Sequence, residues 1–190
     1  MKKSVFIIPG FKEQVSDPQY QWMVTYYGEQ GYIVHMSVIT WKNRVMSDYV
    51  REFSNYYISR KTEENHIIGF SYGAVIAFIS ANDLKPDSLA LCSPSPYFKE
   101  DIQYLKPSWK KEVGVNRIRD FQKYEAIKIA KKINLPTIVF YGTVEGEKYP
   151  QLKVRCEEVV KYIRGAKLVV VNNAPHKIDH PAYREAIKSN

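Results

Sequence analysis

Short, uninterrupted apolar runs alternate along this chain with longer segments of mixed polarity. The runs at residues 4–8, 65–68 and 137–141 are each closed by proline, glycine or serine within a few residues. Apolar runs of this length with such punctuation are typical of strands that are buried on both faces. We therefore expect six strands, at residues 4–8, 32–39, 65–68, 87–92, 137–141 and 167–171.

Helical signals fill the segments between these runs. Asp17-Pro18 offers a helix start that ends at Gly31, Ser47 is expected to cap the next helix, and a closing helix starts near Pro181. Helices are also expected over residues 72–81 and 149–163. The alternation predicts a single α/β domain over residues 1–190, with a three-layer α/β/α sandwich around a mostly parallel sheet.

Residues 97–134 break this alternation. They carry Trp109, several other aromatic residues and many lysines, with helical periodicity expected from Arg117 to Lys132. We interpret them as a small cap-like insertion above the sheet edge. Tyr97, Phe98, Trp109 and Tyr104 are candidate apolar walls of a substrate pocket.

Composition changes this picture little. Apolar residues make up 45% of the 190 and charged residues 25%, as in an ordinary globular domain. No segment approaches the ~18 consecutive apolar residues of a membrane span, and the first apolar run is too short for a signal peptide. We expect a cytoplasmic protein in which Cys92 and Cys156 are reduced, buried thiols.

The net charge of +8 raises the question of an acidic partner. The basic residues are scattered, and the only cluster, at Lys128, Lys131 and Lys132, falls on a plausible helix face exposed to solvent. We therefore expect no nucleic acid or membrane partner. No His/Asp/Cys cluster with ligand spacing and no phosphate-binding loop occurs, so no metal or organic cofactor is expected. The sequence leaves the oligomeric state open.

The chemistry centres on Gly69-Phe70-Ser71-Tyr72-Gly73, which joins a predicted strand to a predicted helix. A serine on such a turn stands out of the sheet near a helix N-terminus, where developing negative charge is favoured. A serine nucleophile needs a base, and the base needs a carboxylate. Glu145 and His176 follow in that order, each after a later strand, and Glu147 remains an alternative acid.

These motifs together resemble the α/β-hydrolase superfamily over almost the whole chain. Gly69 to Gly73 is similar to the nucleophile elbow, Ile8-Pro9-Gly10-Phe11 to the oxyanion loop, Gly142 to Glu145 to the acid loop, and Ala174-Pro175-His176 to the histidine loop. The resemblance implies a fold without the first two strands of the full pattern. It also implies oxyanion donors at the backbone N–H groups of Phe11 and Tyr72.

The same resemblance implies a serine hydrolase that acts on a small-molecule ester or thioester through Ser71, His176 and Glu145. His180 is a rival base, although its place beside Pro181 also suits the start of the last helix, and His35 and His66 suit structural roles. Glutamate replaces the more usual aspartate, and the oxyanion loop has Ile-Pro-Gly where many members have histidine before the glycine. These departures keep a second hypothesis open, in which the chain is a catalytically inactive binding protein.

Overall fold

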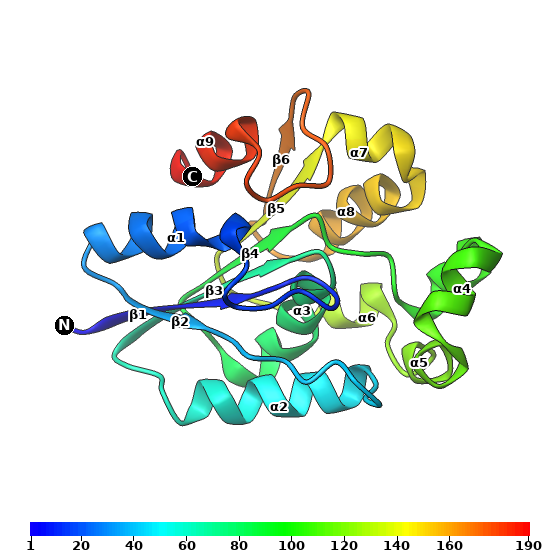
Figure 1. The fold of residues 1–190 in the computed structure, drawn as a ribbon, viewed down its shortest axis with the longest axis horizontal. Helices are drawn as coiled ribbons and strands as arrows, with labels where there is room; N and C mark the ends of the chain where they lie inside the picture. Colours follow the sequence, from blue (N-terminus) through cyan, green and yellow to red (C-terminus); the bar gives the residue numbers. More distant parts are fainter.

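The computed structural model describes residues 1–190 and joins all its strands in one six-stranded sheet. The strands are all parallel and lie in the order β2-β1-β3-β4-β5-β6 (Figure 1). Each parallel pair needs a crossover connection, which explains why helices separate the strands in sequence. The strands are β1 (Lys3–Ile8), β2 (Ile33–Met36), β3 (Glu64–Phe70), β4 (Ser88–Cys92), β5 (Thr137–Gly142) and β6 (Lys167–Val171).

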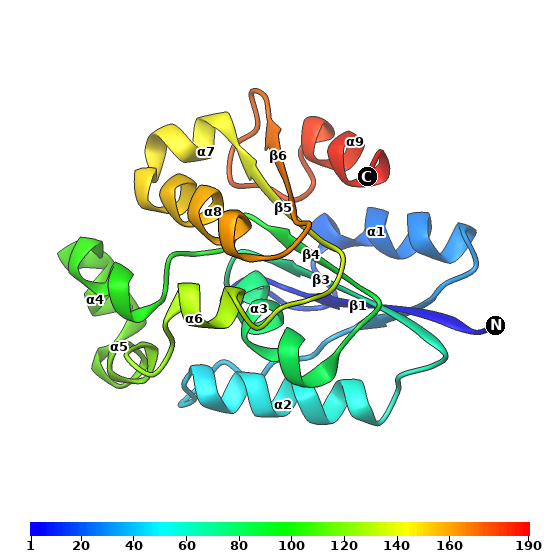
Figure 2. The same cartoon turned by 180° about the vertical axis from the view of Figure 1, so that it is seen from behind.

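Helices cover both faces of this sheet. Figure 1 shows α1 (Pro18–Glu29) and α9 (Pro181–Lys188) on one side, with α2 (Met46–Ile58) and α3 (Tyr72–Leu84) on the other. The reverse view shows α8 (Pro150–Tyr162) in front of the strands, on the same side of the sheet as α3 (Figure 2). The expected α/β/α sandwich is therefore confirmed.

Strand β1 shows why the apolar runs are uninterrupted. Val5 and Ile7 pack into the core under α1 and α9, whereas Phe6 and Ile8 pack into the larger core under α2, α3 and α8. Successive side chains of a strand point to opposite faces, so a strand covered on both sides needs an apolar residue at every position. The two cysteines are buried, unbonded and divided between the two cores.

Strand β2 is shorter than the sequence predicts, because it spans residues 33–36 and not 32–39. It is an edge strand that pairs only with β1, over Ser4 to Ile7. A last hydrogen bond from the Ser37 N–H to the Ile7 carbonyl ends the pairing at 2.8 Å. The β-branched residues beyond it therefore belong to a connecting segment, although their composition favours a strand.

The start of α2 is also a correction. Val45, not Ser47, occupies the N-cap position, and the Asp48 carboxylate accepts a hydrogen bond from the Val45 N–H at 3.1 Å. Ser47 lies inside the first turn, where its hydroxyl contacts the Asp120 carboxylate at 2.8 Å. This contact joins α2 to a segment 73 residues later.

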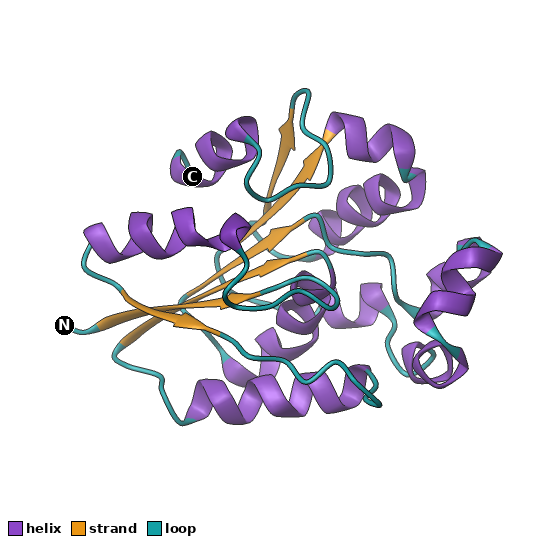
Figure 3. Cartoon of the chain, viewed as in Figure 1, coloured by secondary structure: helices purple, strands orange, loops and turns teal.

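Residues 97–134 contain η1 (Lys99–Tyr104), α4 (Pro107–Val113), α5 (Val115–Phe121) and α6 (Ala126–Ala130). Figure 3 shows α4 and α5 standing beyond the strand ends. The single helix expected over 117–132 is wrong, because the backbone becomes extended at Glu125. There the Lys99 N–H donates to the Tyr124 carbonyl, and the Ala126 N–H donates to the Glu100 carboxylate, so η1 satisfies the groups exposed at the break.

No helix in this structure is both long enough and apolar enough to cross a membrane. The remaining helix, α7 (Thr143–Lys148), follows β5 directly and has only six residues.

Candidate active site

Ser71 lies at the abrupt turn between β3 and α3. Its backbone angles, φ 54° and ψ −115°, fall in a region that non-glycine residues rarely adopt. A Cβ atom added to Gly69 would overlap the backbone of Gly73, and one added to Gly73 would overlap the Ile8 carbonyl. The flanking glycines thus allow β1, β3 and α3 to approach closely, and this tight packing maintains the strained serine.

Ser71, His176 and Glu145 form a continuous hydrogen-bonded chain. His176 Nε2 lies 2.9 Å from Ser71 Oγ, and His176 Nδ1 lies 2.6 Å from Glu145 Oε2. The carboxylate can only accept, so Nδ1 carries the proton and Nε2 is left with a free lone pair. The Phe70 ring packs against the imidazole at a centroid distance of 4.9 Å and restricts its rotation.

The Glu145 side chain is fully buried, and its other oxygen is saturated with donors. Oε1 accepts from the Ser93 hydroxyl at 2.7 Å, from the Tyr183 hydroxyl at 2.8 Å and from the Gly142 N–H. Burial and the nearby Glu145 charge raise the pKa of Tyr183, so its hydroxyl stays protonated and donates. The carboxylate is therefore fixed in orientation as well as in position.

The alternative acid, Glu147, lies on the exposed side of the same short helix, and its carboxylate makes no hydrogen bond within the protein. The acid and histidine loops also contact each other directly. The Asn173 N–H donates to the Thr143 hydroxyl at 2.9 Å. The geometry thus brings Glu145, and not Glu147, to the imidazole.

The other three histidines have structural surroundings. His66 contacts Ser88 and Glu64 through its two ring nitrogens, at 2.6 and 2.8 Å. His35 stacks on Phe6, with ring centroids 4.6 Å apart. His180 occupies the N-cap position of α9, as its place before Pro181 predicts. No group of three or more His, Cys, Asp or Glu side chains is placed to hold a metal ion.

The backbone N–H groups of Phe11 and Tyr72 donate to no acceptor in the turns and loops of the protein, and Tyr72 is the first residue of α3, where a helix leaves its N–H groups unpaired. The rings of these two residues stack at 5.1 Å, which holds the loop after β1 against the start of α3. Both residues line the same cavity as Ser71. Both N–H groups are thus free to donate to a group bound in this cavity.

The loop after β1 is held by residues that sequence reasoning missed. The Glu13 carboxylate accepts hydrogen bonds from the Gly10 N–H, at 2.7 Å, and from the buried Tyr20 hydroxyl. The Trp41 indole N–H donates to the Glu13 carbonyl at 3.0 Å. Burial and the Glu13 charge raise the pKa of Tyr20, which keeps it a donor. Glu13 thus anchors a loop that lacks the histidine found before the glycine in many α/β-hydrolases.

A cavity of about 500 Å³ opens beside Ser71 and His176. Tyr97, Tyr104 and Trp109 line it, as the sequence predicts. Phe98 does not, because it is buried between Phe78 and the Arg155 guanidinium. The backbone is extended here, so neighbouring side chains point to opposite sides, and Phe98 takes the core side. Other aromatic residues on the wall are Phe11, Tyr72 and Tyr149.

A further residue that sequence reasoning missed is Ser95, in the loop after β4. Its Oγ lies 3.1 Å from Ser71 Oγ, and it is only 6% exposed. No charge, spacing or periodicity marks this serine in the sequence. Its position at the carboxyl end of a central strand is the only signal that points to the site.

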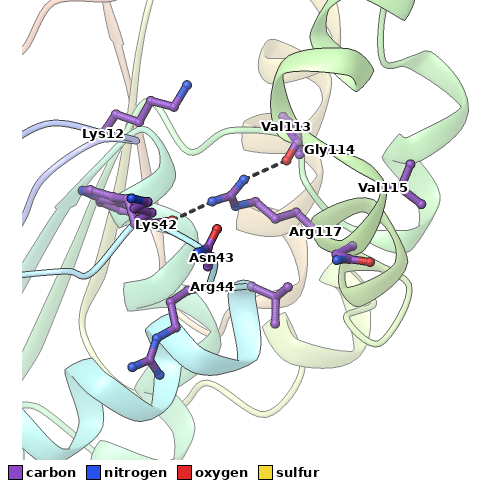
Figure 4. A pocket seen from close by; sticks show the side chains of 11 residues that line it. Lys12, Lys42, Asn43, Arg44, Val113, Gly114, Val115 and Arg117 are labelled. Atoms are coloured by element: carbon purple, nitrogen blue, oxygen red, sulfur yellow. Dashed lines mark hydrogen bonds between the residues drawn. The ribbon is translucent and has the colours of Figure 1, made fainter.

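A second cavity, of about 710 Å³, lies between the segment after β2 and the start of α5 (Figure 4). Ser71, Glu145 and His176 do not line it. Arg117 donates to the Trp41 carbonyl at 2.6 Å and to the Val113 carbonyl at 2.9 Å, as Figure 4 shows. Its guanidinium also lies over the Phe11 ring. Arg117 thus connects the insertion to the loop after β1. In Figure 4, Arg44 is directed away from Arg117, so these two cations do not converge.

Comparison of the sequence with protein-family models and with curated proteins finds no match. Solved structures do match. Est1E from Butyrivibrio proteoclasticus has a TM-score of 0.77 at 16% identity, over 98% of this chain and 85% of that one. A structure of Est1E holds ferulic acid. MenH from S. aureus has a TM-score of 0.66 at 12% identity, over 99% of this chain and 91% of that one.

Dienelactone hydrolase from Anabaena variabilis is similar at a TM-score of 0.66 and 11% identity, over 99% of this chain and 83% of that one. Structural similarity at such low sequence identity establishes the fold alone. The chain has the α/β-hydrolase fold, built on a six-stranded parallel sheet. The fold implied by the sequence motifs is therefore confirmed.

Proposed function

We propose that this protein is a serine hydrolase that cleaves a carboxylic ester or thioester through an acyl-enzyme. The observation that carries the proposal is the hydrogen-bonded chain from Ser71 to His176 to Glu145, with contacts of 2.9 and 2.6 Å, beside a cavity. Support for hydrolysis as the general reaction comes from the neighbours, which include an enzyme described as a hydrolase.

In the proposed mechanism, Ser71 Oγ attacks the carbonyl carbon while His176 Nε2 takes the hydroxyl proton. Glu145 stabilises the imidazolium that results, because its carboxylate holds Nδ1–H. The N–H groups of Phe11 and Tyr72 stabilise the oxyanion, and in related enzymes one such donor contributes about 2.7–4 kcal/mol. His176 then protonates the leaving group, and water repeats the sequence on the acyl-enzyme.

The aromatic part of the cavity wall favours an apolar acyl group, beside a polar part that includes Lys12, Glu112 and Lys148. Six aromatic residues line the cavity: Phe11, Tyr72, Tyr97, Tyr104, Trp109 and Tyr149. Flat aromatic walls bind aromatic or planar groups well, because ring contacts add to area burial. The ferulic acid held by Est1E is an aromatic acid of this kind. We therefore include aromatic acyl esters among the substrates to be tested.

The first test combines turnover with covalent labelling. The wild type is expected to hydrolyse p-nitrophenyl acetate and butyrate, and a fluorophosphonate probe is expected to label Ser71, identified by peptide mass spectrometry. Ser71→Ala removes the nucleophile, so neither turnover nor labelling is expected. Ser59→Ala, at an exposed position after α2, is the matched control and should behave as wild type.

The same experiment addresses the second hypothesis. The glutamate in the acid position and the reduced sheet are the features that favour an inactive binding protein. A wild type that shows neither ester turnover nor labelling of Ser71 would exclude the proposed hydrolase and favour the binding protein.

A further prediction concerns the anchor of the loop after β1. Tyr20→Phe removes the hydroxyl that donates to Glu13 and accepts from the Gly10 N–H at 2.9 Å. The loop that carries the neighbouring Phe11 N–H is then held by fewer hydrogen bonds. We therefore expect kcat to fall about threefold to tenfold, with KM little changed. Steady-state kinetics with p-nitrophenyl butyrate measures this.

Tyr27→Phe is the control for Tyr20→Phe. Tyr27 lies on the same helix, but its hydroxyl makes no hydrogen bond within the protein. Equal kcat values for the two variants would contradict a positioning role for Tyr20.

A further inference from the structure

The candidate nucleophile is in contact with two hydrogen-bonding groups, and His176 is only one of them. Ser95 Oγ lies 3.1 Å from Ser71 Oγ, on a loop that follows a different strand. The Ser95 hydroxyl also lies near the Tyr97 hydroxyl, where it lowers the pKa of that phenol against the larger effect of burial, but its only side-chain contact of hydrogen-bond length is with Ser71, and the residue is only 6% exposed. A buried hydroxyl without a partner is costly, so this contact is its main source of stabilisation.

The direction of this hydrogen bond follows from the number of protons. Glu145 accepts from Nδ1–H of His176, so Nε2 is an acceptor and must receive the single proton of the Ser71 hydroxyl. Ser71 Oγ then has no proton left for Ser95. Ser95 must therefore be the donor, and Ser71 Oγ accepts from it through a lone pair.

The backbone holds this donor in place before any substrate binds. The Ser95 N–H donates to the Ser71 carbonyl at 3.3 Å, and the Ser95 carbonyl accepts from the Tyr97 N–H at 2.9 Å. Ser95 also lies between Pro94 and Pro96, which restrict the backbone on both sides. A donor fixed in this way needs no reorganisation when charge develops on the atom that it faces.

On the basis of the proposed function, we propose that Ser95 is a further catalytic residue, whose hydroxyl stabilises Ser71 Oγ as the leaving group when the acyl-enzyme breaks down. In that step water adds to the acyl carbon and gives a proton to His176 Nε2, and the bond between this carbon and Ser71 Oγ then breaks. The electron pair of that bond goes to Ser71 Oγ, which takes a proton from His176 Nε2. The Ser95 O–H faces the oxygen on which negative charge develops.

The same hydrogen bond has opposing effects on acylation. It eases removal of the Ser71 proton but withdraws electron density from the attacking oxygen. These two effects offset each other in acylation, whereas in deacylation the stabilised leaving group is a net gain. Ser95 is therefore expected to influence kcat more than kcat/KM whenever deacylation limits turnover.

The test is Ser95→Ala with p-nitrophenyl acetate, in stopped-flow and steady-state measurements. We expect kcat to fall about tenfold to a hundredfold, with kcat/KM within about threefold of wild type, since KM falls together with kcat. A burst of p-nitrophenol should become visible, and acetylated Ser71 should accumulate in intact-protein mass spectra. Ser95→Thr retains a hydroxyl and should restore at least part of kcat.

Two results would overturn this inference while leaving the proposed function intact. In the first, Ser95→Ala turns over like wild type. In the second, kcat/KM of Ser95→Ala falls as much as kcat, and no acyl-enzyme accumulates. That result would indicate an effect on acylation or on the folding of the site. A wild type without turnover and without fluorophosphonate labelling of Ser71 would overturn the proposed function and the role of Ser95 together.

Discussion

Replacing Glu145 with glutamine is expected to lower kcat for p-nitrophenyl esters by about 10⁴-fold, although the two side chains have nearly the same shape. Glutamine has one oxygen and one NH₂ group where glutamate has two oxygens. The outcome depends on which of the two faces His176, and the surroundings of Glu145 decide this.

The oxygen of the glutamine is expected to take the place of Oε1. Three donors converge there: the Ser93 hydroxyl, the Tyr183 hydroxyl and the Gly142 N–H. An NH₂ group in that position would face donors only, which is costly in a fully buried site. The NH₂ therefore turns to His176 Nδ1 and donates to it. The proton then moves to Nε2, and the imidazole can no longer accept the Ser71 proton.

Glu147→Gln is the matched control, since it makes the same chemical change two residues away on the exposed side of α7. It should leave kcat within about twofold of wild type, because surface changes of this kind have small effects. A large loss in Glu147→Gln, or wild-type activity in Glu145→Gln, would contradict the assignment of Glu145 as the acid.

Replacing Arg155 with methionine is expected to lower the free energy of unfolding by about 3–5 kcal/mol. Arg155 Nη2 lies 2.6 Å from Asp101 Oδ1, and the two side chains are 3% and 0% exposed. Burial alone would lower the pKa of Arg155, but Asp101, Glu158 and Glu100 outweigh it and raise this pKa above its usual value. The pair joins η1 of the insertion to α8.

Methionine keeps most of the volume of Arg155 but leaves the Asp101 carboxylate buried without a cation. Only neutral donors remain to it, the Gln151 amide and the Phe98 N–H. Urea unfolding followed by circular dichroism measures the loss. Adding Asp101→Asn to Arg155→Met removes the unpaired buried charge, so the double variant should recover part of the lost free energy of unfolding.

Lys153→Met is the control for Arg155→Met. Lys153 lies on the same helix, but it is half-exposed, and its nearest carboxylate, Glu157, is 4.0 Å away. Exposed pairs of this kind contribute at most about 1 kcal/mol. If the two variants lose the same stability, the buried pair does not fasten the insertion to the core.

The sequence predicts the scaffold well because the scaffold depends on periodic burial. The central strands have apolar runs, since both faces of the sheet are covered there. The errors fall where local contacts override composition: β2 ends early at the sheet edge, and the helix expected over 117–132 divides where η1 provides other hydrogen-bond partners.

Some residues of the candidate site can likewise be identified from the sequence, and others cannot. Ser71, Glu145 and His176 are recognisable because each residue type has a distinctive chemistry and follows a strand. Ser95, Tyr20 and Tyr183 escape sequence reasoning, because a hydroxyl in a loop or on a helix face has no spacing that marks it. Only the contacts of the folded chain connect these hydroxyls to the nucleophile, the loop anchor and the acid.

The Ser71–His176 hydrogen bond joins residues 105 positions apart, and the Ser93–Tyr183 contact spans 90. Contacts of such long sequence separation require large loops to close, so they form slowly compared with helical turns. During refolding, helix content should therefore recover before the proposed esterase activity does. For this architecture, the return of catalysis reports completion of the whole sheet, and a population that already has native-like secondary structure can still be inactive.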